Sequence, residues 1–132
     1  MAEFHRLPSR IQEAAQSQLA ANEQVWLCTL GRSDLLNPDF IIITSERVLV
    51  LEERQMGSLS ASYINIRCNL LFSQITAVEL DRSFKHRVFG QASLEVKVNG
   101  DKHLINHISH HEAKHALALI SSQIVPNREM RK

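Results

Sequence analysis

The sequence predicts a mainly β protein of the α+β class, with about seven antiparallel strands, a C-terminal amphipathic helix and a short extra N-terminal helix. Three observations favour this fold. Two apolar runs, Phe40–Ile43 and Val48–Leu51, flank a short polar turn. The pair Asn99-Gly100 is typical of a two-residue hairpin turn, because both residues tolerate positive φ. After Ser109, apolar residues recur at the spacing of one helix face.

The first predicted element is a helix over 9–20. Ser9 and Gln12 have the spacing of a capping box, in which Ser9 would be the N-cap. The apolar residues of this segment share one thin stripe: Ile11, Ala15 and Leu19. Because alanine contributes little burial, we expect this helix to lie on a surface rather than to fill a core.

Residues 24–30 predict the first strand, with the single tryptophan, Trp26, in the core. Residues 31–39 predict a loop. In the central hairpin, 40–43 and 48–51 are apolar on both faces, which a half-solvated sheet does not explain. Their outer side must be covered by the N-terminal helix, by loops or by another subunit. This pattern, together with an open sheet edge, predicts a homo-oligomer.

The second half of the chain predicts an edge strand over 62–67 and strands over 74–81 and 92–98. The apolar residues around the Asn99-Gly100 turn are expected to face inward: Leu94, Val96, Val98, Leu104 and Ile108. The residues that alternate with them are expected to face outward: Ser93, Glu95 and Lys97.

The final predicted element is a helix that starts at Ser109, with Glu112 completing a capping box. Its apolar residues form one stripe: Ala113, Ala116, Leu117, Ile120 and Ile124. Pro126 predicts the end of this helix.

The composition limits the classes of function. The 132 residues suit one domain over 1–132, with a core of about 20–125 between short polar tails. Fifteen Lys and Arg against fourteen acids give a net charge of +1, so no nucleic-acid partner is expected. A signal-peptide core and a bilayer-length apolar run are both missing, which predicts a cytoplasmic protein. Cys28 and Cys68 are expected to be buried or half-buried thiols.

The chain resembles the short bacterial members of the pleckstrin-homology (PH) family. The resemblance rests on Thr44–Arg47 between two apolar strands, on Gln74–Leu80 (QITAVEL) and on the capped C-terminal helix, and it covers roughly Ala20–Ile124. It implies an antiparallel barrel of about seven strands capped by the helix. It also implies a non-enzymatic interaction module that binds proteins or lipids and self-associates through strand edges. We expect a protein partner, whose identity stays open.

One departure from the family concerns lipid headgroups. Members that bind phosphoinositides carry basic residues across the first hairpin. Here the corresponding loop offers Arg32 against Asp34 and Asp39, so it has almost no net positive charge. Phosphoinositide binding is therefore not expected.

The candidate ligand-binding residues are Arg82, Lys85 and Arg87, which lie with Phe84 and Phe89 in one polar connection. Basic residues interleaved with aromatics can grip phosphates or insert at a membrane interface. A solvated loop with a packed phenylalanine explains the same residues. The alternative function that follows is a peripheral binder with weak affinity for an anionic membrane surface.

One string resembles a zinc-hydrolase motif: His111, Glu112 and His115 match HExxH, which makes a minimal zinc hydrolase a further alternative. The apolar stripe predicts that both histidines face solvent, and downstream only Glu129 could be a third ligand. A wider histidine cluster adds residues that could respond to pH or bind a stray divalent ion: His103, His107 and His110. We therefore expect no catalytic residues, no metal site and no cofactor.

Overall fold

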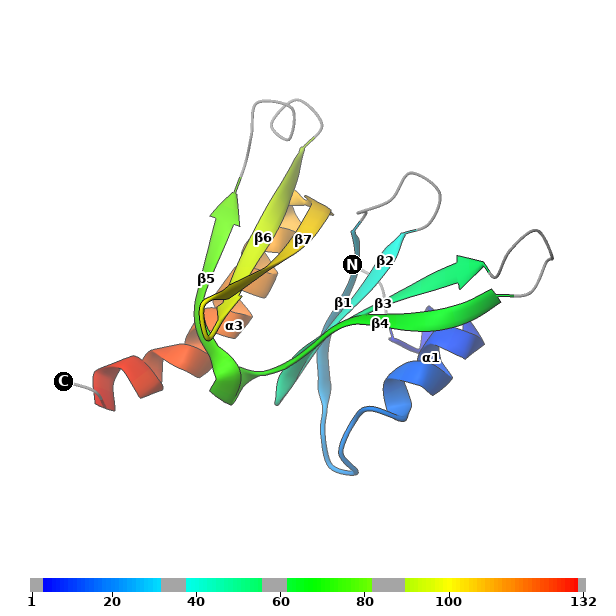
Figure 1. The fold of residues 1–132 in the computed structure, drawn as a ribbon, viewed down its shortest axis with the longest axis horizontal. Helices are drawn as coiled ribbons and strands as arrows, with labels where there is room; N and C mark the ends of the chain where they lie inside the picture. The colour runs from blue at the N-terminus through cyan, green and yellow to red at the C-terminus, as the bar shows by residue number, and fades with distance from the viewer. Residues whose placement is uncertain (1–3, 32–37, 56–61, 82–89, 131–132) are drawn as a thin grey trace. The chain divides into compact units, whose positions relative to one another are not determined.

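The computed structural model describes residues 4–31, 38–55, 62–81 and 90–130; for residues 55, 62 and 125–130 it describes the backbone. The elements, in chain order, are η1 (Phe4–Arg6), α1 (Ser9–Gln16), β1 (Val25–Gly31), β2 (Asp39–Thr44), β3 (Arg47–Gln55), β4 (Ser62–Leu71), η2 (Phe72–Gln74), β5 (Ile75–Asp81), β6 (Gln91–Val98), β7 (Asp101–Ser109) and α3 (His110–Met130) (Figure 1). The chain groups into two compact units, Met1–Asn69 and Leu70–Lys132.

The mainly β class with a C-terminal helix and a short N-terminal helix is confirmed. The described strands form two antiparallel sheets, of order β1-β2-β3-β4 and β5-β6-β7, and no closed barrel. Because β1 and β4 end the first sheet and β5 and β7 end the second, these four are the edge strands among the described residues. The predicted edge position of 62–67 is thus confirmed, within a longer strand.

In the first unit, α1 packs against one face of the four-stranded sheet (Figure 1). The cluster between them is buried and apolar, and it joins the helix region to three strands: Leu7, Ile11, Ala15, Cys28, Ile42, Leu49 and Leu51. The N-terminal helix therefore covers one side of the central hairpin. It was one of the three covers expected from the sequence, together with loops and another subunit. The expectation that this helix contributes little to a core is wrong, because Ile11 is 2% and Ala15 is 0% exposed.

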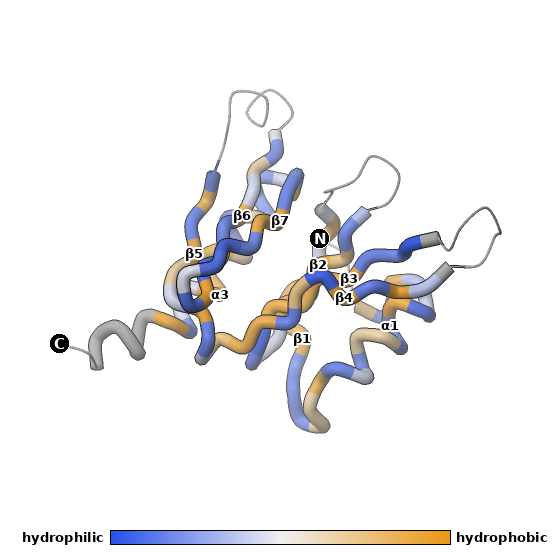
Figure 2. Tube along the Cα trace, in the orientation of Figure 1, coloured by the Kyte–Doolittle hydropathy of each residue, from blue (hydrophilic) through white to orange (hydrophobic). Residues whose placement is uncertain are grey.

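The opposite face of the hairpin is buried as well. Its apolar residues are 0–2% exposed within the single chain: Ile41, Ile43, Val48 and Val50. Figure 2 shows the apolar stretches of this sheet along the trace. Burial on both faces explains why these strands lack alternation.

Two local predictions in this unit are wrong. Pro8, not Ser9, is the N-cap of α1, and Gln12 Nε2 donates to the carbonyls of His5 and Leu7 instead of closing a capping box. Trp26 is 36% exposed rather than in the core. It lies where the register between β1 and β2 shifts, between Val25 and Leu27, and such a bulge redirects a side chain.

In the second unit, β6 and β7 are joined by the predicted turn. Asn99 has φ of 50° and Gly100 has φ of 90°, the left-handed conformations that a type I′ turn requires. The turn pairs Val98 with Asp101. Counting outward along both strands then places Val96 opposite His103 and Leu94 opposite Ile105.

This register corrects the predicted inward face. Leu104 lies opposite Glu95 and is 52% exposed, whereas Ile105 and Ile108 are buried. Ile108 returns to the inner face because the register shifts between Ala92 and Leu94. His107, with φ of 57°, lies in the β7 segment opposite this shift. Ser93, expected outside, is buried.

Helix α3 packs on the three-stranded sheet through the predicted stripe. Four of its residues are buried: Ala113, Ala116, Ile120 and Ile124. Leu117 is half-buried. The backbone N–H of Glu112 donates to Ser109 Oγ at 3.3 Å, which is one of the two hydrogen bonds of the predicted capping box. The helix continues to Met130, so the end predicted at Pro126 is wrong; a proline removes one N–H donor without always terminating a helix. Of the described helices, none has the length and apolar character for a membrane crossing.

Candidate functional site

The predicted anionic patch, Arg82, Lys85 and Arg87, lies outside the described residues. The strands that flank it end at the exposed Asp81 and begin again at Gln91. The patch therefore remains a prediction from the sequence.

The HExxH residues lie on the first turns of α3. His111 and His115 are exposed, as predicted, and Glu112 is half-buried. Among the described residues, no group of three or more His, Cys, Asp and Glu side chains is placed to hold a metal ion. His111 and His115 are exposed on α3 four residues apart, whereas a zinc centre needs at least three protein ligands.

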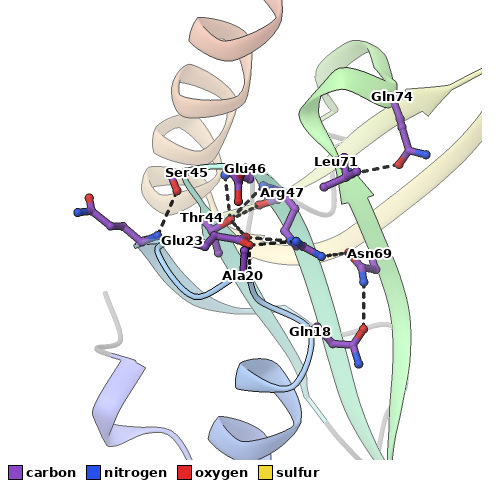
Figure 3. A network of polar contacts seen from close by, with 11 residues as sticks. Gln18, Ala20, Glu23, Thr44, Ser45, Glu46, Arg47, Asn69, Leu71 and Gln74 are labelled. Atoms are coloured by element: carbon purple, nitrogen blue, oxygen red, sulfur yellow. Dashed lines mark hydrogen bonds and ion pairs between the residues drawn. The ribbon is translucent and has the colours of Figure 1, made fainter.

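A polar network in the first unit joins the segment before β1 to the β2–β3 turn (Figure 3). The Glu23 carboxylate accepts hydrogen bonds from Arg47 Nε at 2.9 Å and from Arg47 Nη2 at 3.0 Å. Thr44 Oγ1 donates to the same carboxylate and accepts from the N–H groups of Glu46 and Arg47 at 3.0 Å each. The Glu23 side chain is 0% exposed and that of Arg47 is 15% exposed, so this is a buried ion pair.

The charge of Glu23 is held by these partners. Burial alone would raise the pKa of Glu23, but hydrogen bonds from Arg47, from Thr44 and from the Ala20 N–H together lower it below its ordinary value of 4.5. Arg47 also donates to Asn69 on β4. The network therefore fixes the turn to two other segments of the unit.

A second network lies at the other end of the central hairpin. Asp39 and Glu52 are Cα partners across β2 and β3, and they are 1% and 4% exposed. Arg67 Nη1 donates to Asp39 Oδ2 at 3.3 Å, and Asn65 donates to Glu52 at 2.9 Å. Arg54 also donates to Glu52, at 2.6 Å. Two like charges opposite each other would repel, so these donors are what allow both carboxylates to be buried.

A pocket of about 330 Å³ lies where α1 leads toward β1. It is lined by small and apolar side chains together with two polar ones: Phe4, Gln16, Leu19, Ala20, Ala21, Glu23 and Val25. Its volume is near the lower limit of small-molecule sites. Because the Glu23 carboxylate is already bonded to Arg47 and Thr44, the pocket suits an apolar group better than a charged ligand.

The two cysteines are both free thiols, Cys28 buried and Cys68 half-buried, as the sequence predicted. Burial raises the pKa of Cys28 to about 11, and burial likewise raises the pKa of Cys68. Neither has the lowered pKa of a reactive cysteine.

Large exposed apolar side chains form the most consistent surface feature. In the described part of the chain there are six, and all lie on edge strands: Trp26 and Leu30 on β1, Tyr63, Ile66 and Leu71 on β4, and Leu104 on β7. Among the side chains that the structure describes, the inner strands β2, β3 and β6 carry none, and neither do α1 and residues 110–124 of α3. The sequence patterns did not indicate this surface, because they predicted Trp26 and Leu104 in the core.

Comparison of the chain with protein-family models, with curated proteins and with solved structures gives no match.

Proposed function

We propose that the protein is a non-enzymatic PH-like interaction module, which self-associates and binds protein partners through its edge strands. The observation that carries this proposal is the confinement of the six large exposed apolar side chains to β1, β4 and β7. An edge strand presents unpaired N–H and C=O groups, which are a template for another strand. Apolar side chains beside that template add buried surface when a partner strand docks.

The location of these side chains changes the argument for self-association. The sequence pointed to the central hairpin, but Ile42 and Leu49 are 0% exposed within one chain and cannot form an interface without unfolding. The edge strands can do so while the core stays intact. Proteins commonly protect edge strands with charges, whereas here Trp26, Ile66 and Leu104 are exposed.

The PH-like part of the proposal rests on the order of the elements. The resemblance implies about seven antiparallel strands followed by one C-terminal helix, and the described residues follow this order. Interaction rather than catalysis is supported by the absence of a gathered metal site among the described residues and by two cysteines whose thiols are not activated.

The test is the molar mass in solution, measured by light scattering behind a sizing column over micromolar concentrations. We expect a multiple of the chain mass of 15.0 kDa. Three variants each place one lysine on a different edge strand: Trp26→Lys, Ile66→Lys and Leu104→Lys. The variant of the strand that forms the interface should have the molar mass of a single chain. Ala118→Lys, on the exposed side of α3, is the matched control and should keep the parent mass. A single-chain mass for the parent at every concentration contradicts the proposal.

A further inference from the structure

The turn between β6 and β7 contains the one asparagine of the chain that is followed by glycine. Of the seven asparagines in the sequence, six precede a residue with a side chain, whereas Asn99 precedes Gly100. Both turn residues are exposed. A Cβ atom added at Gly100 would meet no atom within 4 Å beyond the neighbouring residues, so the space around this peptide bond is open.

The Asn99-Gly100 peptide can react with its own side chain. Asparagine is a chemically labile residue, and glycine has no Cβ to shield its backbone nitrogen. The Gly100 nitrogen gives its proton to solvent and bonds to Asn99 Cγ, while the Cγ–Nδ2 bond breaks and ammonia leaves. Water then opens the cyclic imide that results. Breaking the bond from this nitrogen to Cγ gives aspartate, and breaking its bond to the backbone carbonyl carbon gives isoaspartate.

The position of the turn in the hairpin favours this reaction. Ring closure requires rotation about the Asn99 Cα–C bond, so the turn must open briefly. Asn99 and Gly100 are held in the left-handed conformation at the end of two strands, where Val98 and Asp101 form the last pair. Local opening costs least at such exposed ends, so it can occur while the rest of the sheet stays paired.

We infer that Asn99 is a site of spontaneous deamidation, and that its isoaspartyl product breaks the register of the β6–β7 hairpin. The aspartyl product keeps the register, because a type I′ turn accepts Asp-Gly as well as Asn-Gly. The isoaspartyl product carries the chain through Cγ, which adds one atom to the backbone of a two-residue turn. Val98 and Asp101 then cannot pair as they do in the structure.

A lengthened turn affects the core of the second unit. The turn fixes Val96 opposite His103 and Leu94 opposite Ile105. Leu94 and Val96 are 0% exposed and Ile105 is 1% exposed. Because register decides which side chains of a strand face the core, isoaspartate in the turn should lower the melting temperature.

The test follows the full, folded chain during incubation at mildly alkaline pH. Trypsin cleaves after Lys97 and Lys102 and releases 98–102, in which Asn99 has the only side-chain amide. Mass spectrometry detects the replacement of its NH₂ group by OH, and reversed-phase chromatography separates the aspartyl from the isoaspartyl peptide. We expect both products.

Two asparagines of β4 are internal controls. Asn65 donates to Glu52 at 2.9 Å, and Asn69 donates to Gln18 at 3.2 Å. Each is followed within the strand by a bulky apolar residue, which shields the backbone nitrogen. Both should keep their amides while Asn99 loses its own. Equal rates at the three positions in the folded protein overturn the assignment of Asn99.

Two variants separate the effect of the new charge from that of the longer backbone. Asn99→Gly keeps a turn sequence that type I′ accepts and has no side chain to react, so its melting temperature should stay constant during incubation. Asn99→Asp carries the charge of both products on a normal backbone and should melt like the fresh parent. The incubated parent should gain a lower melting transition in proportion to its isoaspartyl content. An incubated parent that is rich in isoaspartate but melts like Asn99→Asp overturns the inference about the hairpin.

Discussion

The inner strands and the edge strand β1 of the four-stranded sheet have similar apolar content but differ in exposure, because β1 buries Leu27 and Cys28 yet exposes two other large apolar side chains. In β2 and β3, Ile42 and Leu49 are 0% exposed, while Trp26 and Leu30 of β1 are 36% and 46% exposed. The difference follows from strand order, since an inner strand has two neighbours and β1 has β2 alone among the described strands. An apolar strand therefore indicates either a core or an interface, and its place in the sheet decides which.

The largest expected effect concerns the ion pair that closes the inner hairpin. Arg47→Met should destabilise the fold by about 3–5 kcal/mol at pH 7, because it leaves the buried Glu23 carboxylate without its cation. Arg10→Met is the matched control: Arg10 Nη1 and Glu53 Oε2 are 2.8 Å apart, close to the 2.9 Å of the buried pair, but their side chains are 50% and 45% exposed. It should cost less than about 1 kcal/mol. Denaturant unfolding measures both, and equal losses would contradict the distinction between buried and exposed pairs.

Leucine truncation tests the inner and edge strands directly. Leu49→Ala on β3 should cost about 2–5 kcal/mol, because the side chain is fully buried under α1. Leu30→Ala on β1 should change the unfolding free energy of the single chain by less than about 1 kcal/mol but weaken self-association. Thermal melts and light scattering on both variants separate the two effects. A core-sized stability loss in Leu30→Ala would show that the Leu30 side chain belongs to the core.

The pH dependence of stability sharpens the same contrast. Because the folded-state pKa of Glu23 is below 4.5, the folded chain binds this proton less readily than the unfolded chain. Its contribution to stability is therefore present above pH 4.5 and is lost as the pH falls below that value. Glu23→Gln should be less stable than the parent at pH 7, and the gap should narrow in acid. A constant gap across urea titrations from neutral to acidic pH would rule out this linkage.

The smallest expected effect is on the solvated side of α3. Glu112→Gln and His115→Ala should leave the melting temperature nearly unchanged, because His115 is exposed and Glu112 is only half-buried. Ile120→Ala, on the side that faces the sheet, is the contrasting variant and should lower it clearly, because Ile120 is 0% exposed. One equivalent of tightly held zinc in the parent, lost in His115→Ala, would reverse the interpretation of the HExxH string.

Local patterns in the sequence predict the strands and the Asn99-Gly100 turn, because turn chemistry and β-branched runs act over a few residues. Leu104 was predicted on the wrong face of β7. The two-residue turn pairs Val98 with Asp101, and counting along both strands from that pair places Leu104 opposite the outward Glu95. The correct face of Ile105 could therefore have been derived from the turn. The return of Ile108 to the inner face depends on a register shift that no local pattern announces.

The candidate surface was harder to predict than the fold. Exposure of Trp26 and Leu30 follows from the position of β1 at a sheet edge, and strand order is a property of the whole unit. The Glu23–Arg47 pair joins residues 24 positions apart, and charge spacing along the chain does not reveal such a pair. Strand order and long-range ion pairs depend on the whole fold, so local sequence patterns do not predict them.

The register of the central hairpin depends on the polar residues at its two ends. Because β2 and β3 are apolar on both faces, sliding one strand past the other by a residue would exchange one apolar face for another, with little hydrophobic penalty. Such a slip would move Glu52 from its place opposite Asp39 and Arg47 from its place beside Thr44. The buried Glu23 carboxylate would then lose its cation, at a cost of several kcal/mol. Electrostatics thus selects the one correct alignment of a hairpin whose hydrophobicity tolerates several.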